Sequence, residues 1–242
     1  MKDILIFRRV EKKYRLTPAQ KDALLSTVQS HLTPDAHGRS TICSLYLDTP
    51  DHLIIRNSID ARIYKEKLRL RSYGTPTPDE SVFLEIKKKY KGVVYKRREI
   101  LTLNEAMAYI RGGDMPRDTQ IMREIDYARR FYRQPQPAML IAYEREAYFD
   151  RDLPSLRITF DTNVRYRDDD LQLDHGHHGT RLLPEDMILM EIKTDGAMPL
   201  WLARALSEHG LRPSSFSKYG TAYQITAGLI PPLHSPDGAS TD

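Results

Sequence analysis

Lys67, Arg69 and Arg71 occupy every second position of a five-residue segment whose other two positions are leucines. In an extended strand, side chains two residues apart share a face, so the three cations project together, opposite the leucines. The same alternation places Glu85 and Lys87 opposite apolar neighbours. A row of cations can neutralise and orient phosphate groups through charge-assisted hydrogen bonds. The pattern therefore predicts strands with a phosphate-binding face.

Two further segments repeat this alternation. Arg157 and Asp161 stand opposite three apolar residues in one segment, and Glu191 and Lys193 do so in the other. An ordinary half-buried sheet with a solvated face explains any one such strand. Recurring cations favour another arrangement, because like charges on neighbouring strands repel. We expect a closed barrel whose apolar faces point outward and whose cation-lined lumen holds a linear phosphate chain, since duplex DNA is too wide for a small barrel.

Carboxylates accompany the cations in three Glu-x-Lys pairs, which are Glu11-Lys12-Lys13, Glu85-Ile86-Lys87 and Glu191-Ile192-Lys193. In each pair the carboxylate and the ammonium point to the same face of the strand. Such carboxylates can hold Mg²⁺ or Mn²⁺ that bridges phosphate oxygens. Cross-strand charge pairing is the alternative, and the spacing leaves both interpretations open.

Period-two alternation predicts the strands that position these residues. They span Phe7–Arg15, Ile42–Asp48, Tyr64–Tyr73, Val82–Lys89, Val93–Leu101, Met139–Tyr148, Leu156–Asp161 and Met187–Lys193. Helices are expected after the Thr17-Pro18 capping signal and over Leu103–Arg111, Asp118–Arg133 and Leu200–His209. Many antiparallel strands with a few helices predict an α+β protein built around a barrel.

The composition fits one soluble globular domain, with 40% hydrophobic and 29% charged residues in a chain of 242. We expect the domain to cover residues 1–227 and a disordered tail to cover residues 228–242. The single cysteine, Cys43, excludes an internal disulfide and fits a reducing cytoplasm. The absence of a signal peptide or membrane-spanning stretch also favours a cytoplasmic location.

An ordered series of short motifs runs through the chain. They are Arg9-x-Glu11-x-Lys13-Tyr14, Ser44-Leu45-Tyr46-Leu47-Asp48-Thr49, Lys67-Leu68-Arg69-Leu70-Arg71-x-Tyr73-Gly74, Phe83-Leu84-Glu85-Ile86-Lys87, Lys96-Arg97-Arg98, Tyr143-x-Arg145, Leu156-Arg157-Ile158-Thr159-Phe160-Asp161, Met190-Glu191-Ile192-Lys193 and Phe216-Ser217-Lys218-Tyr219-Gly220. The series resembles the polyphosphate polymerase domain of the vacuolar transporter chaperone (VTC) complex, a branch of the triphosphate tunnel metalloenzymes. The resemblance extends from about Arg8 to Tyr223.

The resemblance implies a closed eight-stranded antiparallel β-tunnel with flanking helices, which adds the γ-phosphate of ATP to a growing polyphosphate chain. It implies Arg69, Arg71, Lys87 and Lys96 as catalytic cations, Lys13, Arg56, Lys67, Arg145, Arg157, Lys193 and Lys218 as phosphate-binding cations, and Glu191 as a ligand of Mn²⁺ or Mg²⁺. Arg98 points to the same face. The expected partners are ATP and polyphosphate, with a membrane protein needed for any transport.

One departure from the pattern bears on activity. Many tunnel triphosphatases begin with Glu-x-Glu-x-Lys, whereas Arg9 stands first here, which favours polymer handling over hydrolysis. A triphosphate hydrolase and a non-catalytic polyphosphate-binding module are the alternatives on the same fold. RNA binding is disfavoured because the basic strands show no aromatic stacking platform. His175, His177 and His178 lie in a polar segment, 168–179, that we expect to be a mobile loop.

Overall fold

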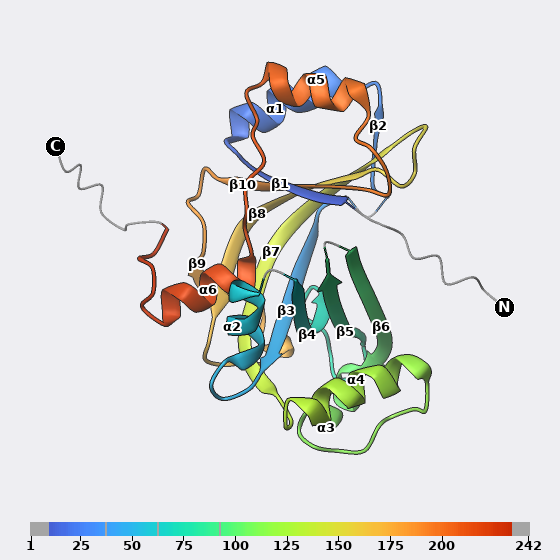
Figure 1. The fold of residues 1–242 in the computed structure, drawn as a ribbon, viewed down its shortest axis with the longest axis vertical. Coiled ribbons are helices and arrows are strands. Elements are labelled where there is room, and N and C mark those ends of the chain that lie inside the picture. The colour runs from blue at the N-terminus through green and yellow to red at the C-terminus, as the bar shows by residue number, and fades with distance from the viewer. Residues whose placement is uncertain (1–9, 37, 62, 92, 234–242) are drawn as a thin grey trace.

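A strongly curved antiparallel sheet of ten strands runs through the protein (Figure 1). The structure is a computed structural model and describes residues 10–36, 38–61, 63–91 and 93–233. The beginning of the strand expected from Phe7 and most of the expected C-terminal tail, residues 234–242, lie outside the described residues. We call the face that carries Lys13, Arg69 and Glu191 the inner face of the sheet, and the opposite face the outer face.

Eight strands form the main path of the sheet, in the order β1-β10-β8-β7-β3-β4-β5-β6, while β2 pairs with β7 and β9 pairs with β8. The strands are β1 (Val10–Leu16), β2 (Leu32–Pro34), β3 (Ser40–Asp48), β4 (Tyr64–Tyr73), β5 (Ser81–Tyr90), β6 (Val93–Thr102), β7 (Gln136–Asp150), β8 (Arg157–Arg167), β9 (Thr180–Arg181) and β10 (Ile188–Thr194). The main path consists of the eight strands that alternation predicts. The predicted total of eight was wrong, because β2 and β9 are too short to show a period of two.

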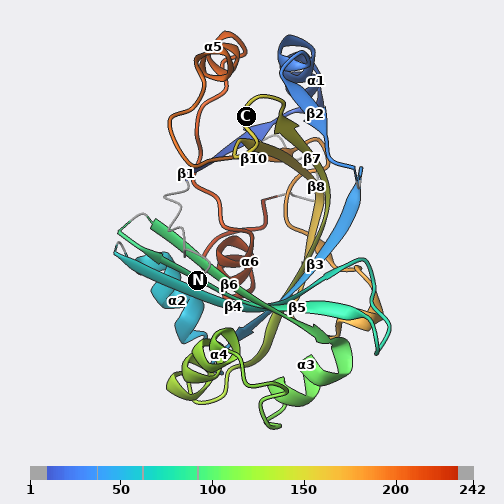
Figure 2. The ribbon, with the colours of Figure 1, turned by 90° about the vertical axis from the view of Figure 1, so that its right-hand side faces the viewer.

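The predicted closure of the tunnel was also wrong. Within the described residues, β1 and β6 are the two ends of the hydrogen-bonded path and do not pair with each other. Figure 2 shows β1 and β10 well above β4, β5 and β6. Long charged side chains fill the space between these two parts, and Lys87 Nζ reaches Glu11 Oε2 at 3.3 Å. Backbone pairing needs strands about 4.8 Å apart, which leaves no room for two facing layers of such side chains.

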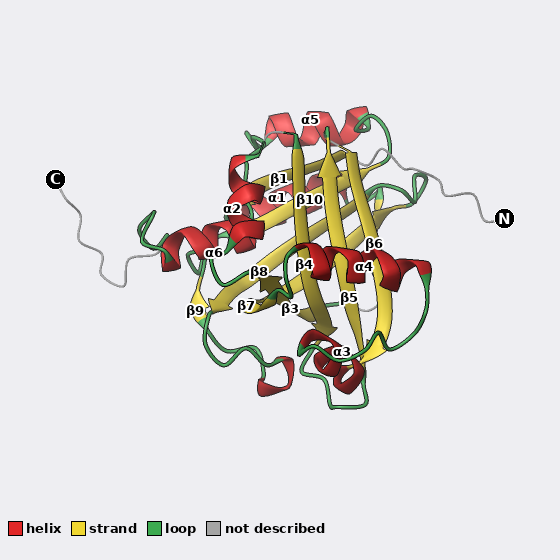
Figure 3. Ribbon diagram, turned by 60° about the horizontal axis from the view of Figure 1, so that its bottom comes forward, coloured by secondary structure: helices red, strands yellow, loops and turns green. Residues whose placement is uncertain are grey.

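The helices are α1 (Pro18–Val28), α2 (Leu53–Asp60), α3 (Leu103–Ile110), α4 (Gln120–Phe131), α5 (Leu200–Glu208) and α6 (Lys218–Thr226), together with the short 3₁₀ helix η1 (Leu173–His175). The outer face is covered by α1 and α5 at one end and by α3 and α4 at the other (Figures 1 and 3). The predicted start of α1 is confirmed, because Thr17 and Gln20 form a reciprocal capping box there. The expected helices at α3, α4 and α5 are likewise present.

The outer face carries two hydrophobic cores, as the alternation predicts. Leu68, Leu70 and Ile86 are buried in one core, in which Ala106 of α3 and Met122 of α4 are also buried. The second core contains Ile158 of β8 with buried residues of α1 and α5. Burying aliphatic side chains stabilises the fold by roughly 1.5–3 kcal/mol each. The outward direction of the apolar residues is therefore confirmed, and it fixes the charged residues on the inner face.

Helix α6, which the sequence did not reveal, packs on the inner face. Tyr219 and Ala222 of α6 are buried with Tyr46 of β3 and with Ile141 and Tyr143 of β7. Figure 1 places α6 to one side of the curved sheet, beside α2. Part of the concave inner surface is thus filled by a hydrophobic cluster, and the charged residues of the inner face lie beside it.

The polar loop at residues 168–179 is organised by a single buried side chain. The Arg167 guanidinium donates hydrogen bonds to the backbone carbonyl oxygens of Asp170, Gln172, Gly176 and His178, at 2.8–3.0 Å. The loop therefore wraps around one cation. In the described part of the chain, no helix is both long and apolar enough to cross a membrane.

Candidate functional site

Strands β4, β5 and β6 present parallel rows of side chains on the inner face. Their register aligns Lys67 with Lys87 and Lys87 with Lys96 in one row. The next row contains Arg69 and Glu85, with Arg98 opposite Glu85. Successive rows lie about 6.7 Å apart, because each residue advances a strand by 3.3–3.4 Å. The sequence predicted these cations for one face, and the structure brings them together there.

Glu85 holds three of these cations. Its carboxylate accepts hydrogen bonds from Arg69 Nε at 2.8 Å and Arg98 Nε at 2.7 Å, and Lys96 Nζ lies 2.6 Å away. Burial alone would raise the pKa of Glu85, but Arg69, Arg71 and Lys96 hold it well below its usual range. Burial also lowers the pKa of Lys96 to about 7, against the opposing charge of Glu85. Because three cations contact it at 2.6–2.8 Å, the Glu85 carboxylate is a counter-ion for arginine rather than an open metal ligand. The contacts of Glu191 are longer, at 3.1–3.7 Å.

Glu191 lies at the centre of the facing wall, formed by β1, β10, β8 and β7. Four cations surround its carboxylate, at 3.1 Å for Lys193, 3.6 Å for Lys218, 3.7 Å for Lys13 and 3.7 Å for Arg145. Burial favours the neutral acid, but Lys193, Lys218 and Lys13 outweigh it and keep the pKa of Glu191 well below normal. Glu191 is therefore ionised at neutral pH.

Asp161 of β8 pairs with two of the same cations, Arg145 and Lys218. It is fully buried, and its two oxygens accept hydrogen bonds from Arg145 Nε at 2.5 Å and Arg145 Nη2 at 2.7 Å. Lys218 Nζ lies 2.5 Å from Asp161 Oδ2. Sequence reasoning gave Asp161 no role, although alternation placed it on the charged face beside Arg157. Its position beneath both cations could not be read from spacing along the chain.

The segment that leads into α6 reaches two further lysines. Lys67 Nζ donates to Ser217 Oγ at 2.7 Å, and Lys13 Nζ donates to the Phe216 carbonyl oxygen at 2.7 Å. Burial lowers the pKa of Lys67 to about 8. Ser217 also caps α6 by accepting from the Gly220 N–H, and a methyl group at Gly220 would lie only 3.1 Å from that hydroxyl. The motif Phe216-Ser217-Lys218-Tyr219-Gly220 thus joins α6 to both walls.

Two predicted cations differ from the rest. Arg157 lies at the edge of the site, where its Nη2 is 3.2 Å from Asp35 Oδ2. Arg56 is part of α2, and its guanidinium pairs with Asp51 at 2.7 Å while both side chains are largely exposed. The structure therefore brings together all the predicted cations except Arg56, which forms its own exposed ion pair.

Hydroxyl groups complete the inner face, and sequence reasoning overlooked them. Arg71 donates to Ser44 Oγ and to Tyr143 Oη, each at 3.2 Å, and Arg69 Nη1 donates to Tyr46 Oη at 3.2 Å. Burial would raise the pKa of Tyr46, but Arg69 and the neighbouring cations lower it to about 8. A signal was present, since all three hydroxyl residues belong to the motifs quoted above and alternate toward the charged face.

The donor set of the inner face can accommodate a divalent cation together with phosphate. Among the described residues, no three His, Cys, Asp or Glu side chains are close enough to hold a metal by themselves. Mg²⁺, however, is commonly held by one or two carboxylates plus phosphate oxygens and water. Lys13 Nζ lies 3.7 Å from a carboxylate oxygen of both Glu11 and Glu191, so these two groups already share one cation. This arrangement fits a substrate-assisted metal site at Glu191.

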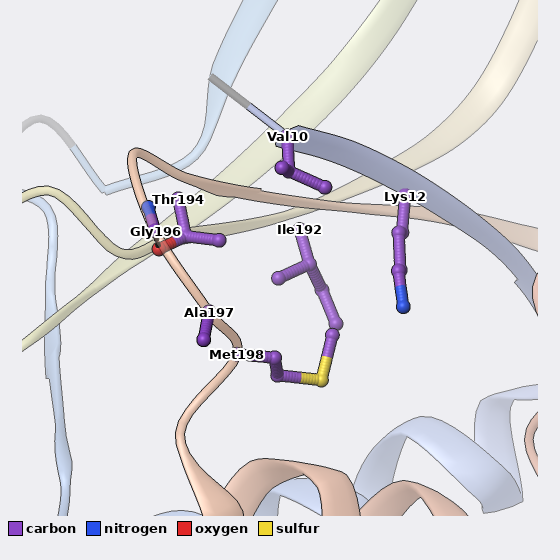
Figure 4. Close-up of a pocket in the computed structure, with 7 residues that line it drawn as sticks. All are labelled: Val10, Lys12, Ile192, Thr194, Gly196, Ala197 and Met198. Atoms are coloured by element: carbon purple, nitrogen blue, oxygen red, sulfur yellow. Dashed lines mark hydrogen bonds between the residues drawn. The ribbon is translucent and has the colours of Figure 1, made fainter. Parts of the chain in front are cut away.

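A separate pocket of about 230 Å³ lies away from this charged surface (Figure 4). Val10, Ile192 of β10 and Met198 contribute apolar side chains to its lining, and Lys12 also lines it. Ile192 and Lys12 alternate with Glu191 and Lys13, so the pocket is on the outer face of the sheet. It takes no part in the cation cluster.

The fold and the charged inner face together define an α+β protein with a strongly curved antiparallel sheet whose concave side is rich in Lys and Arg. The chain belongs to the VTC domain family, whose pattern matches residues 8–227. The solved structures similar to this chain include a provisionally named adenylate cyclase from Bacillus halodurans, with a TM-score of 0.54, 11% identity, and coverage of 87% of this chain and 95% of that one. Another is the PH1819 protein from Pyrococcus horikoshii OT3, with a TM-score of 0.48, 13% identity, and coverage of 91% and 99%. No curated protein matches the sequence.

Proposed function

We propose that this chain is a polyphosphate polymerase that transfers the γ-phosphate of ATP to the end of an inorganic polyphosphate chain. The observation that carries the proposal is the surplus of Lys and Arg over Asp and Glu along one concave surface. Glu85, Glu191 and Asp161 neutralise part of the charge, and a polyanion is the ligand that can neutralise the remainder. Membership of the VTC domain family supports the same assignment.

In this mechanism the chain's residues position and neutralise rather than form covalent bonds. Phosphoryl transfer depends chiefly on in-line placement and on compensation of the phosphate charge. Lys87 and Lys96 on one wall face Lys13 and Lys193 on the other, so cations can hold a phosphate chain from two sides. Glu191 and Glu11 would hold Mn²⁺ or Mg²⁺, which supplies further charge compensation when it is bound.

Incubation of the purified protein with γ-labelled ATP and Mn²⁺ tests the proposal. We expect ADP and long labelled phosphate chains, with free phosphate as the minor product, and a shorter lag when short polyphosphate is added as a primer. Rapid release of free phosphate without polymer would identify a hydrolase. Tight polyphosphate binding without ATP consumption would identify a binding module. A cytoplasmic location and a membrane-protein partner remain predictions of the same proposal.

A further inference from the structure

At one end of β4, β5 and β6, the inner face changes from cationic to aromatic and apolar. Tyr73 follows Arg71 on the inner face of β4, and the register aligns Arg71 with Phe83 and Phe83 with Ile100. Tyr73 and Ile100 are 54% and 52% exposed. The rings of Tyr73 and Phe83 meet edge to face, with centroids 5.6 Å apart. We call Tyr73, Phe83 and Ile100 the aromatic rim.

Arg98 lies over a ring of this rim, whereas Arg157 lies over Phe149 of β7, which is not part of the rim. The Arg98 guanidinium carbon is 4.3 Å from the centre of the Phe83 ring, and that of Arg157 is 5.0 Å from the centre of the Phe149 ring. Burial lowers the pKa of Arg157, and the Tyr73 hydroxyl is among the nearby groups that oppose this shift. Within the described residues, Arg157 Nε is buried and has no hydrogen-bond partner. Ring faces and guanidinium planes are the surfaces on which nucleobases stack.

We propose that the aromatic rim receives the nucleobase of a nucleoside triphosphate, whose phosphates then extend along the cation rows toward Lys67. From the Arg71 row to the Lys67 row, β4 advances about 13 Å, and each row on the way offers a new set of cations. The inference rests on the proposed function in taking ATP as the phosphoryl donor. It adds a binding site for the nucleoside, which the phosphate-binding cations do not provide.

The rim is continuous with the cation rows, and this favours a nucleoside triphosphate as its ligand. A nucleoside triphosphate joins one flat aromatic group to a short polyanion, and the rim joins one exposed aromatic surface to Arg71 and Arg98 on the same face. Arg98 already pairs with Glu85, but Arg71 donates to the uncharged hydroxyls of Ser44 and Tyr143, and an apolar peptide or a lipid chain would bring it no anion. Tyr127 and Phe131 form another exposed aromatic pair, 68% and 66% exposed, but they lie on α4 over the outer face. That pair therefore provides a matched control.

Calorimetric titration with ATP and, separately, with inorganic tripolyphosphate tests the proposal. Because the two ligands differ by the nucleoside, we expect Tyr73→Ser and Phe83→Leu to weaken ATP binding about tenfold, within the range of single-base stacking. Tripolyphosphate binding should change less than twofold. The control Tyr127→Ser should leave the affinity for both ligands unchanged. Unaltered ATP affinity in the rim variants, or equal weakening of both ligands, would overturn the proposal.

Photolabelling of the unsubstituted protein with 8-azido-ATP avoids any effect of a substitution on folding. We expect the label on peptides that contain Tyr73 or Phe83, and labelling confined to other segments would contradict the proposal. The polymerase assay separates this outcome from that of the proposed function. Labelling at the rim without polymer formation would refute the polymerase and leave the nucleobase site standing. Polymer formation with unaltered ATP KM in both rim variants would refute the nucleobase site alone.

Discussion

Replacing Asp161 by asparagine tests whether the buried ion cluster holds α6 against the wall formed by β7, β8 and β10. The wild-type carboxylate is fully buried and pairs with Arg145 and Lys218 at 2.5 Å each. Asparagine has nearly the same shape but no charge, so both cations would stay buried with Glu191 as their remaining acidic partner, at 3.7 and 3.6 Å. The substitution therefore isolates the charge of Asp161 from its volume.

Removing one partner of a buried ion pair costs about 3–5 kcal/mol, because the remaining charge is left uncompensated. Because Glu191 still attracts both cations, we expect Asp161→Asn to lower the free energy of unfolding by about 3 kcal/mol, the lower end of this range. For a domain of this size, each kcal/mol lowers Tm by about 2–4 °C. We therefore expect Tm to fall by about 6–12 °C at pH 7, as measured by differential scanning calorimetry.

The matched control is Glu146→Gln, which breaks the partly exposed pair between Lys21 and Glu146, 2.6 Å apart. Pairs of that kind contribute about 0–1 kcal/mol, so Tm should fall by less than about 4 °C. Tripolyphosphate should raise the Tm of Asp161→Asn more than that of the wild type, since an added anion replaces the lost charge. Equal losses of Tm in the two variants would refute the reasoning.

Three further predictions concern the charged residues themselves. Glu191→Gln should nearly abolish turnover but largely preserve polyphosphate binding, because it removes the metal-binding carboxylate and leaves the cations; full activity across a Mn²⁺ titration would show that Glu191 is structural. Arg69→Ala or Arg71→Ala should reduce kcat/KM at least a hundredfold in the ATP assay, since a charge-assisted contact in a desolvated site is worth several kcal/mol; a loss below tenfold would argue against a role in transfer. Burial lowers the pKa of Lys96 to about 7 and that of Lys67 to about 8, below the ordinary lysine pKa of about 10.4, so the unfolded chain binds more protons over this range of pH. Stability should therefore rise from pH 7 to 9 in thermal melts, and a steady fall would contradict this.

The eight main strands could be predicted because apolar and charged residues alternate regularly along them, one kind for each face of the sheet. In β4, each leucine must face the outer core and each cation the inner face, and this constraint is local to the strand. The alternation therefore predicted which side chains point to the inner face. It could not show whether β1 and β6 pair, because closure depends on how two distant edges approach in space.

Helix α2 is capped by a residue that does not directly precede it. Its first turn is capped by Asp48, whose carboxylate accepts hydrogen bonds from the N–H groups of Ile54 at 2.8 Å and Ile55 at 3.0 Å. The residue at the N-cap position itself, His52, has a positive φ of 56° and makes no side-chain cap. A search for an N-cap residue directly before the helix therefore finds nothing, and Arg56 was assigned without its helix.

The aromatic rim was missed for a related reason. The sequence showed no stacking platform, because Tyr73, Phe83 and Ile100 lie 10 to 27 positions apart along the chain. They become neighbours only through the pairing of β4 with β5 and of β5 with β6. Two-residue alternation reports the face of each residue but not the register between strands, and the rim depends on that register.

The more exposed cations are suited to binding phosphate, and the more buried ones stabilise the arrangement of the site. The side chains of Arg69, Arg145 and Lys218 are 15%, 10% and 9% exposed, and each already pairs with a buried carboxylate. Those of Lys87 and Lys96 are 34% and 37% exposed, and an ammonium has three donors, of which one carboxylate contact uses one. The lysines can therefore add phosphate contacts while keeping their carboxylate partners. The guanidinium of Arg69 already uses N–H groups to contact Glu85, so fewer of its donors are available to phosphate. On this reasoning, loss of Lys96 weakens polyphosphate binding in a salt-dependent way, while loss of Arg69 also disturbs the position of every group that Glu85 holds.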